Sequence, residues 1–205
     1  MKKEMTIAYD VHNGLYINLT NRCPCACTFC LRQTMDHVGQ SGGLWLEHEP
    51  SYDEVVRAIQ TCDLSRYSEV VFCGFGEPTE RLDVLLDVAK FIKDTCPDKK
   101  IRINTNGLGN LVCGEPIAHR LTGLIDVVSI SLNTPDAAEY LRLTRSKFGE
   151  GSFDAMLRFA KDCVAAVPEV VMTTVDTTIS HDEEEQCRAI CEKIGARYRI
   201  RPWED

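Results

Sequence analysis

The sequence lacks the features of a membrane or secreted protein. No uninterrupted apolar run reaches the length that a transmembrane helix requires. The N-terminus, Met1 to Thr6, begins with lysines and continues into polar residues, so it has no apolar signal core. We therefore predict a cytoplasmic protein with no membrane association.

An excess of positive charge is also missing. The chain has 23 Lys and Arg against 31 Asp and Glu, a formal net charge of −8. We do not expect nucleic acid as a partner, because no general basic surface is available for a phosphate backbone. Internal repeats and linkers rich in Gly, Ser and Pro are absent. With 205 residues and 44% hydrophobic content, the sequence predicts one domain spanning residues 1–205.

Cysteine, in contrast, is abundant. The chain has 11 cysteines and no secretion signal, which indicates thiolate ligands in a reducing compartment rather than a disulfide framework. Cys23, Cys27 and Cys30 have the spacing C-x3-C-x2-C. Three such thiolates can hold three irons of a cubane cluster and leave the fourth iron open to a ligand. With Cys25 the run offers four thiolates, which also fit a structural zinc site in a non-enzymatic interaction module.

Apolar, β-branched runs alternate with amphipathic helical runs along the chain, a pattern typical of a parallel sheet. The predicted strands are 15–19, 69–73, 100–105, 126–132, 170–177 and 197–201, and the predicted helices are 52–62, 82–95, 116–121, 153–167 and 182–194. Capping boxes start two of the helices, at Ser51 with Glu54 and at Ser180 with Glu183. The predicted fold is an α/β partial (β/α)6 barrel whose last strand lies near the C-terminus.

Polar segments follow the predicted strands, where a parallel barrel gathers its catalytic groups. The second strand is followed by Gly74, Gly76 and Glu77, and the third runs into Asn104-Thr105-Asn106-Gly107. The fourth and fifth carry Ser131, Asn133 and Thr174. The long loop over residues 33–50 is predicted to be lid-like, because long loops in compact domains usually serve binding.

Together these motifs resemble the radical S-adenosylmethionine (SAM) superfamily, and the overall run of the sequence resembles its small TatD-nuclease-associated group. The resemblance implies one [4Fe–4S] cluster on Cys23, Cys27 and Cys30, with Cys25 outside the cluster. It also implies reductive cleavage of SAM to a 5′-deoxyadenosyl radical that abstracts hydrogen from a substrate. The SAM-binding residues that it indicates are Phe29, Gly74, Gly76, Glu77, Asn104, Ser131, Asn133 and Thr174.

The resemblance does not identify a substrate. The small size favours a protein or peptide substrate, and it also suits an activase of a glycyl-radical enzyme. An electron donor such as flavodoxin or ferredoxin is expected as a partner. The glycine-containing adenine segment common in the family is absent after the fifth predicted strand, so the adenine contacts are not assigned.

Overall fold

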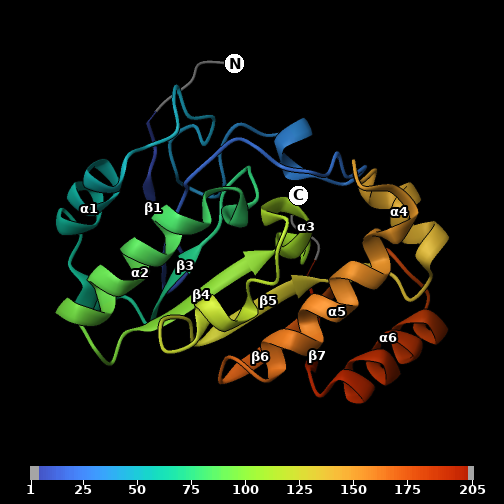
Figure 1. Ribbon diagram of the computed structural model, residues 1–205. Coiled ribbons are helices and arrows are strands. Elements are labelled where there is room, and N and C mark those ends of the chain that lie inside the picture. Colours follow the sequence, from blue (N-terminus) through green and yellow to red (C-terminus); the bar gives the residue numbers. More distant parts are fainter. Residues whose placement is uncertain (1–4, 203–205) are drawn as a thin grey trace. The chain divides into compact units, whose positions relative to one another are not determined.

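The computed structural model describes residues 5–202 and shows an α/β fold in which strands alternate with helices (Figure 1). The strands are β1 (Ala8–Val11), β2 (Gly14–Ile17), β3 (Glu69–Phe72), β4 (Lys100–Thr105), β5 (Val127–Ser131), β6 (Glu169–Val175) and β7 (Arg197–Arg201). The helices are α1 (Tyr52–Gln60), α2 (Leu82–Thr95), α3 (Gly109–Cys113), α4 (Ala137–Thr144), α5 (Ser152–Val164) and α6 (His181–Ile194). These elements belong to two compact units, each described here by itself.

The first unit contains β1 to β4 with α1 and α2, and its described residues are 5–23, 30–104 and 123–126. β1 and β2 form an antiparallel hairpin, with Ala8 opposite Ile17. β2 pairs with β3, and β3 with β4, in parallel, so Ile17, Phe72 and Ile103 lie in register. Their carboxyl ends therefore lie at one edge of this part of the sheet.

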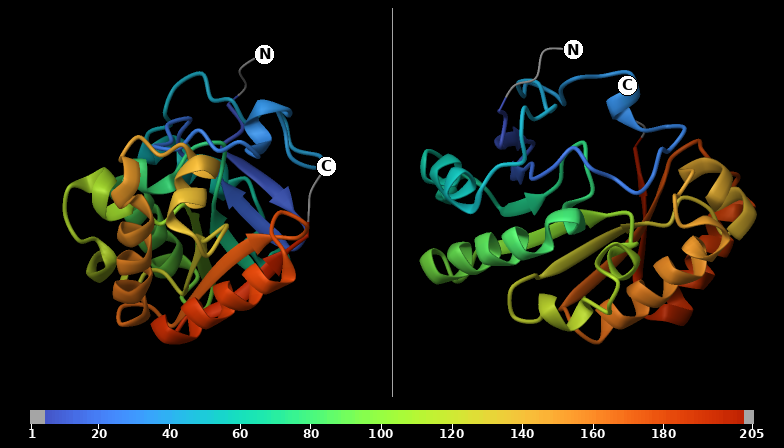
Figure 2. Two further views of the ribbon diagram at one scale, coloured as in Figure 1. Left: turned by 90° about the vertical axis from the view of Figure 1, so that its right-hand side faces the viewer. Right: turned by 45° about the horizontal axis from the view of Figure 1, so that its top comes forward.

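Alternation along these strands separates an apolar face from a polar one. Leu15, Val70 and Ile101 are fully buried, and α2 lies along β3 and β4 (Figures 1 and 2). Tyr16 and Arg102 point to the opposite face and are only half-buried. On that face the Arg102 guanidinium forms a bidentate pair with the Glu69 carboxylate, at 2.6 and 3.1 Å.

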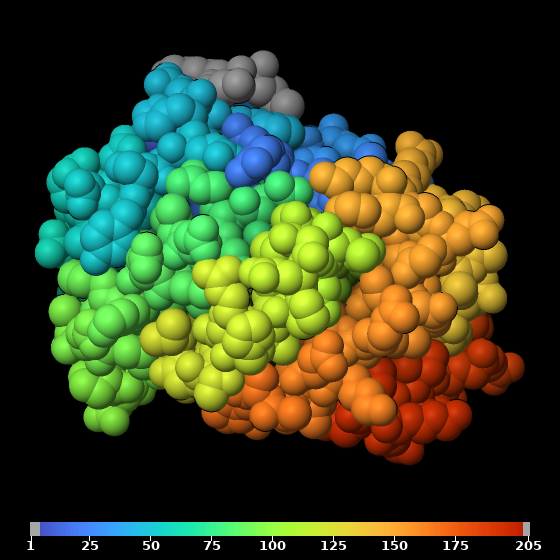
Figure 3. Space-filling view, in the orientation of Figure 1, coloured from blue at the N-terminus to red at the C-terminus, as the bar shows by residue number. Residues whose placement is uncertain are grey.

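The second unit contains β5 to β7 with α3 to α6, and its described residues are 24–29, 105–122 and 127–202. β5 pairs with β6, and β6 with β7, all in parallel, so Ser131 is opposite Thr173 and Val175 is opposite Arg201. Helices α5 and α6 pack against these strands and lie side by side, which Figure 3 shows from the outside. Val128, Ile130 and Met172 are fully buried, and they form the apolar side of this unit.

All six predicted strands are present, and both predicted capping boxes are confirmed at Ser51 and Ser180. β1 was missed, because four residues with one tyrosine carry little strand signal before their hairpin partner is known. The predicted helix at 116–121 is instead a short 3-10 turn over Ala118–Leu121. Among the described residues no helix is both long and apolar enough to cross a membrane.

Two helices, α3 and α4, were not predicted. α3 has only five residues and begins with a glycine, so its sequence has low helix propensity. α4 does carry a helix-start signal in its sequence. Asp136 is an N-cap residue whose carboxylate accepts a hydrogen bond from the Glu139 amide. The predicted single domain over residues 1–205 stays a prediction.

We expect Glu69→Ala to lower the free energy of unfolding by about 3 kcal/mol, because it leaves the largely buried Arg102 cation without its carboxylate. Glu169→Ala is the matched control. Glu169 also begins a strand and pairs with an arginine on its neighbour, but that partner, Arg197, has a side chain that is 63% exposed. The control should cost about 1 kcal/mol or less. Equal losses in urea denaturation would contradict the role of burial.

Candidate functional site

The turn after β3 lies unusually close to the chain that precedes the cysteine motif. A Cβ atom on Gly76 would lie 2.3 Å from the carbonyl oxygen of Thr20 and 2.6 Å from that of Arg22. Both neighbours are backbone atoms and cannot move aside as a flexible side chain would. The amide of Glu77 donates to the Arg22 carbonyl oxygen at 2.8 Å. Glycine is therefore required at 76 for this approach.

Glu77 is buried at the tip of this turn, with 3% of its surface exposed. Its Oε1 accepts hydrogen bonds from the amide and the hydroxyl of Thr79, at 3.2 and 2.8 Å. These bonds cap the 3-10 turn Pro78–Arg81 and fix the direction of the carboxylate. An ionised carboxylate has about four acceptor positions, so capping does not exhaust its capacity to hold a cation.

Gly74 also makes a close approach in the first unit. Its missing Cβ would lie 2.1 Å from Oδ1 of Asn18, a fully buried side chain whose Nδ2 donates to the Leu44 carbonyl oxygen at 2.8 Å. Asn18 thereby connects the end of β2 with the loop over residues 33–50. Both predicted glycines have a steric reason in the structure.

In the second unit, the middle of the cysteine motif is attached to the C-terminal end of α4. The amides of Ala26 and Thr28 donate to the carbonyl oxygens of Thr144 and Leu143, each at 2.9 Å. Carbonyl groups in the last turn of a helix have no partner inside the helix, so they are available to hold this segment. Cys27 lies between the two bonded amides and is half-buried.

A pocket of about 250 Å³ lies beside this segment, within the second unit. Its lining residues are Thr28, Phe29, Asn133, Leu143, Val175, Thr177 and Thr178. Asn133 is buried, with 5% of its surface exposed. Its Oδ1 has no hydrogen-bond partner among the described residues. Because a buried polar atom without a partner is costly, it marks a place for a ligand or water hydrogen.

Asn133 and Thr177 both have positive φ angles, of 66° and 65°. Asparagine tolerates this left-handed conformation, but a β-branched threonine adopts it rarely. Strained residues at a pocket are a recognised mark of functional sites. Sequence reasoning missed Thr28, Thr177 and Thr178, since backbone angles and the meeting of two distant loops are not visible in the residue pattern.

Other predicted residues are placed differently. Thr174 is fully buried, and its hydroxyl hydrogen-bonds the Tyr198 hydroxyl at 2.6 Å. Arg188 of α6 stacks over the Tyr198 ring, so Thr174 lies on the helix-covered side of β6 rather than among the pocket residues. Asn104 accepts a hydrogen bond from Arg102 at 2.8 Å. Ser131 is half-buried at the end of β5 and does not line the pocket.

The cysteines fall into distinct environments. Cys23, Cys27 and Cys30 are half-buried, whereas Cys25 is buried and lies 3.8 Å from Nδ2 of Asn106. Cys187 and Cys191 are buried in α6, and burial raises the pKa of their thiols to about 12 and about 11. These two cysteines are therefore core residues of the second unit. Thiols with such high pKa values are poor metal ligands at neutral pH.

The predicted cofactors fit the residues present. Three half-buried cysteines with the C-x3-C-x2-C spacing would provide the thiolates, and the buried Glu77 carboxylate would provide a negative charge for SAM. Within residues 5–202 no three His, Cys, Asp or Glu side chains are placed around a single ion. A cubane cluster does not need such convergence, because each cysteine binds a different iron.

Comparison with known proteins places the chain in a family. The model of the Radical SAM superfamily matches residues 17–194. GTP 3′,8-cyclase of Corynebacterium glutamicum is 33% identical over 145 residues, covering 66% of this chain and 34% of the relative. The same enzyme of Mycobacterium sp. (strain KMS) is 30% identical over 195 residues, covering 93% of this chain and 51% of the relative. The chain thus spans about a third to a half of these relatives.

A solved structure has the same fold at low sequence identity. Streptococcus suis SuiB bound to its precursor peptide SuiA aligns with a TM-score of 0.69 and 17% identity, covering 94% of this chain and 39% of SuiB. This likeness confirms the predicted α/β partial barrel, and the family match confirms the cofactors. The chain belongs to the radical SAM superfamily, whose members bind a [4Fe–4S] cluster and SAM.

Proposed function

We propose that this enzyme cleaves SAM reductively and removes a hydrogen atom from its substrate, with the cluster held by Cys23, Cys27 and Cys30. The observation that carries the proposal is the C-x3-C-x2-C motif inside a family match over residues 17–194. When bound and reduced, the cluster supplies the electron that splits SAM into methionine and a 5′-deoxyadenosyl radical. An external one-electron donor, such as flavodoxin or ferredoxin, must provide that electron.

The residues of the first unit are proposed to hold the methionine part of SAM. Glu77 is buried and has a fixed direction, so its carboxylate suits a primary ammonium group. Gly74 and Gly76 allow the close packing that holds this turn, and with it Glu77, in place.

Residues of the second unit are proposed to hold the adenosine part. The pocket has apolar walls from Phe29, Leu143 and Val175, which suit the faces of an adenine ring. Oδ1 of Asn133 needs a hydrogen donor, and the ribose hydroxyls and the adenine amino group are all donors. In this chain, Thr177 and Thr178 take the place of the glycine-containing adenine segment. Ser131 stays a proposed SAM contact. Asn104 and Thr174 are not proposed as contacts, because their side chains bond Arg102 and Tyr198.

A second proposal concerns the substrate. Arg197, Arg199 and Arg201 alternate along β7, so their side chains share one face. Nε of Arg201 is buried and lacks a hydrogen-bond partner in the described part of the chain. Arg201 is the cross-strand neighbour of Val175, which lines the pocket. The named relatives are cyclases of GTP, a substrate with three phosphates. We therefore propose an anionic nucleotide substrate, in place of the protein or peptide expected from size.

The remaining alternatives have less support. No relative described above is an activase of a glycyl-radical enzyme, and the resemblance to the TatD-nuclease-associated group stays a prediction. A zinc-binding interaction module does not agree with the family match.

Cysteine replacement tests the cluster ligands. Protein purified without oxygen should contain about four irons and four sulfides per chain. Cys23→Ala, Cys27→Ala and Cys30→Ala should each lose this iron, because each removes one of three ligands. Cys25→Ala is the control and should keep most of it, since Cys25 is buried beside Asn106. Analysis of iron and zinc per chain measures the outcome. A colourless protein with one zinc would contradict the proposed cluster.

Replacement of Glu77 tests SAM binding. Glu77→Gln keeps an oxygen to cap Thr79 but loses the negative charge, so we expect SAM affinity to fall about tenfold or more while iron is retained. Titration calorimetry measures the affinity, and chromatography of 5′-deoxyadenosine after dithionite reduction measures cleavage. Glu150→Gln, at an exposed position, should match the unmodified protein in both. Unchanged SAM affinity in Glu77→Gln would contradict its assignment.

Replacement of Arg201 tests the substrate proposal. Arg201→Gln should weaken binding of GTP and of inorganic triphosphate about tenfold, because a charge-assisted contact is lost. Its affinity for SAM should not change. Arg188→Gln, on the helix-covered side, is the control. If Arg201→Gln weakens SAM binding and leaves GTP binding unchanged, the arginine serves SAM and the substrate proposal is wrong.

A further inference from the structure

The carboxylate of Glu49 lies at the end of the loop over residues 33–50 and joins three separate segments of the first unit. Its Oε1 accepts from the Thr20 hydroxyl at 2.6 Å. The Arg22 guanidinium donates to both of its oxygens, through Nε at 2.6 Å and Nη2 at 3.2 Å. Arg81 donates to Oε2 from a third segment, at 3.3 Å. One anion thus contacts two cations, and the Glu80 carboxylate lies 3.7 Å from the Arg22 guanidinium.

The environment of Glu49 keeps it ionised. Burial opposes the charge of this carboxylate, but hydrogen bonds from Thr20 and Arg22 outweigh burial and hold its pKa below the usual value. The side chains of Arg22 and Glu49 are 55% and 36% exposed, so water weakens this pair relative to a buried one. Arg81 is anchored further by donating to the Pro50 carbonyl oxygen at 3.1 Å, and its side chain is only 17% exposed.

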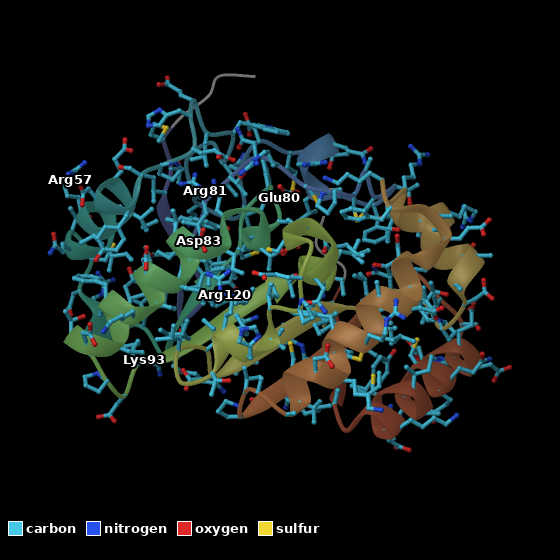
Figure 4. The ribbon with its side chains drawn as sticks, viewed as in Figure 1. Arg57, Glu80, Arg81, Asp83, Lys93 and Arg120 are labelled. Carbon is cyan, nitrogen blue, oxygen red and sulfur yellow. The ribbon has the colours of Figure 1, made fainter. Side chains whose placement is uncertain are left out.

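The segments that Glu49 joins are the two sides of the Gly76–Glu77 turn. On one side, Gly76 lies against the carbonyl oxygens of Thr20 and Arg22. The Arg22 carbonyl oxygen also accepts a hydrogen bond from the Glu77 amide. On the other side, Arg81 ends the 3-10 turn that Glu77 caps. Figure 4 shows Glu80 and Arg81 at the start of α2. Arg22 also donates to the Glu80 carbonyl oxygen at 3.1 Å, which connects the two sides directly.

The loop is held at further points. Asn21 exchanges two hydrogen bonds with the backbone of Leu46, at 2.8 and 3.0 Å. The Trp45 ring packs edge-on against Phe75, with centroids 5.3 Å apart. Residues 44–50 are therefore fastened to the same turn by apolar contacts, backbone bonds and charge. Of these, only the Glu49 bonds reach both sides of the turn.

We propose that Glu49 is a positioning residue for SAM: its carboxylate holds Thr20, Arg22 and Arg81 so that the Gly76–Glu77 turn has its binding geometry before SAM arrives. Glu49 itself contacts no cofactor in this proposal. The proposal rests on the proposed function of Glu77, and it assigns the end of the 33–50 loop a fixed supporting role. Preorganisation of this kind raises affinity because less order must be gained on binding.

Glu49→Gln tests this proposal, because it retains the shape and the acceptor oxygen but removes the charge. We expect the KM for SAM in reductive cleavage to rise about tenfold, as for the loss of one charge-assisted contact, with kcat within about twofold. Iron content should not change. In the cofactor-free protein, hydrogen exchange of the segment containing the Glu77 amide should speed up. Glu47→Gln, exposed in the same loop, is the matched control and should change none of these values.

Arg81→Gln provides a second variant that breaks only one side of the arrangement, and it should shift KM and exchange in the same direction. If Glu49→Gln leaves both KM and exchange unchanged, the proposal is wrong. If it lowers iron content and thermal stability in parallel with SAM affinity, Glu49 is merely structural and the proposal is also wrong. Failure of the proposed function would appear differently, because the unmodified protein would then form no 5′-deoxyadenosine.

Discussion

The contact between the backbone of Gly76 and the carbonyl oxygens of Thr20 and Arg22 is the constraint on which the proposed SAM site depends. No side chain fits there, so the turn after β3 and the segment before Cys23 are adjacent only because residue 76 is glycine. The buried Glu77 takes its direction from the same contact, through the bond of its amide to Arg22 and through its cap on Thr79.

Charged side chains of the first unit form ion pairs at two places. Arg102 is bonded to Glu69 on the polar face of the sheet, and Glu49 is bonded to Arg22 and Arg81 at the carboxyl ends of the strands. The second unit is organised differently. Its pocket is lined by threonines and apolar residues, and Asn133 presents an oxygen without a partner in residues 5–202. The proposed contacts of the methionine part of SAM are therefore ionic, and those of its adenosine part are neutral.

Much of the fold was predictable, because strand and helix periodicities are local properties. The six parallel strands, the capping boxes at Ser51 and Ser180 and the burial of Cys187 and Cys191 all follow from short stretches of sequence. Short elements that carry little signal by themselves were missed. β1 needs β2, and the five-residue α3 has too few internal bonds to be recognised alone.

The sequence by itself determined the family, because the spacing of Cys23, Cys27 and Cys30 and the Gly-Glu turn are linear patterns that are readable without the fold. Only the tertiary structure decided which polar residues face a ligand. Thr174 was predicted to bind SAM, but strand alternation does not tell which face the helices cover, and its hydroxyl bonds Tyr198 on the covered side. The contacts of Glu49 were equally invisible, since its partners lie 27 to 32 positions away in the chain and meet only when the loop folds onto the turn.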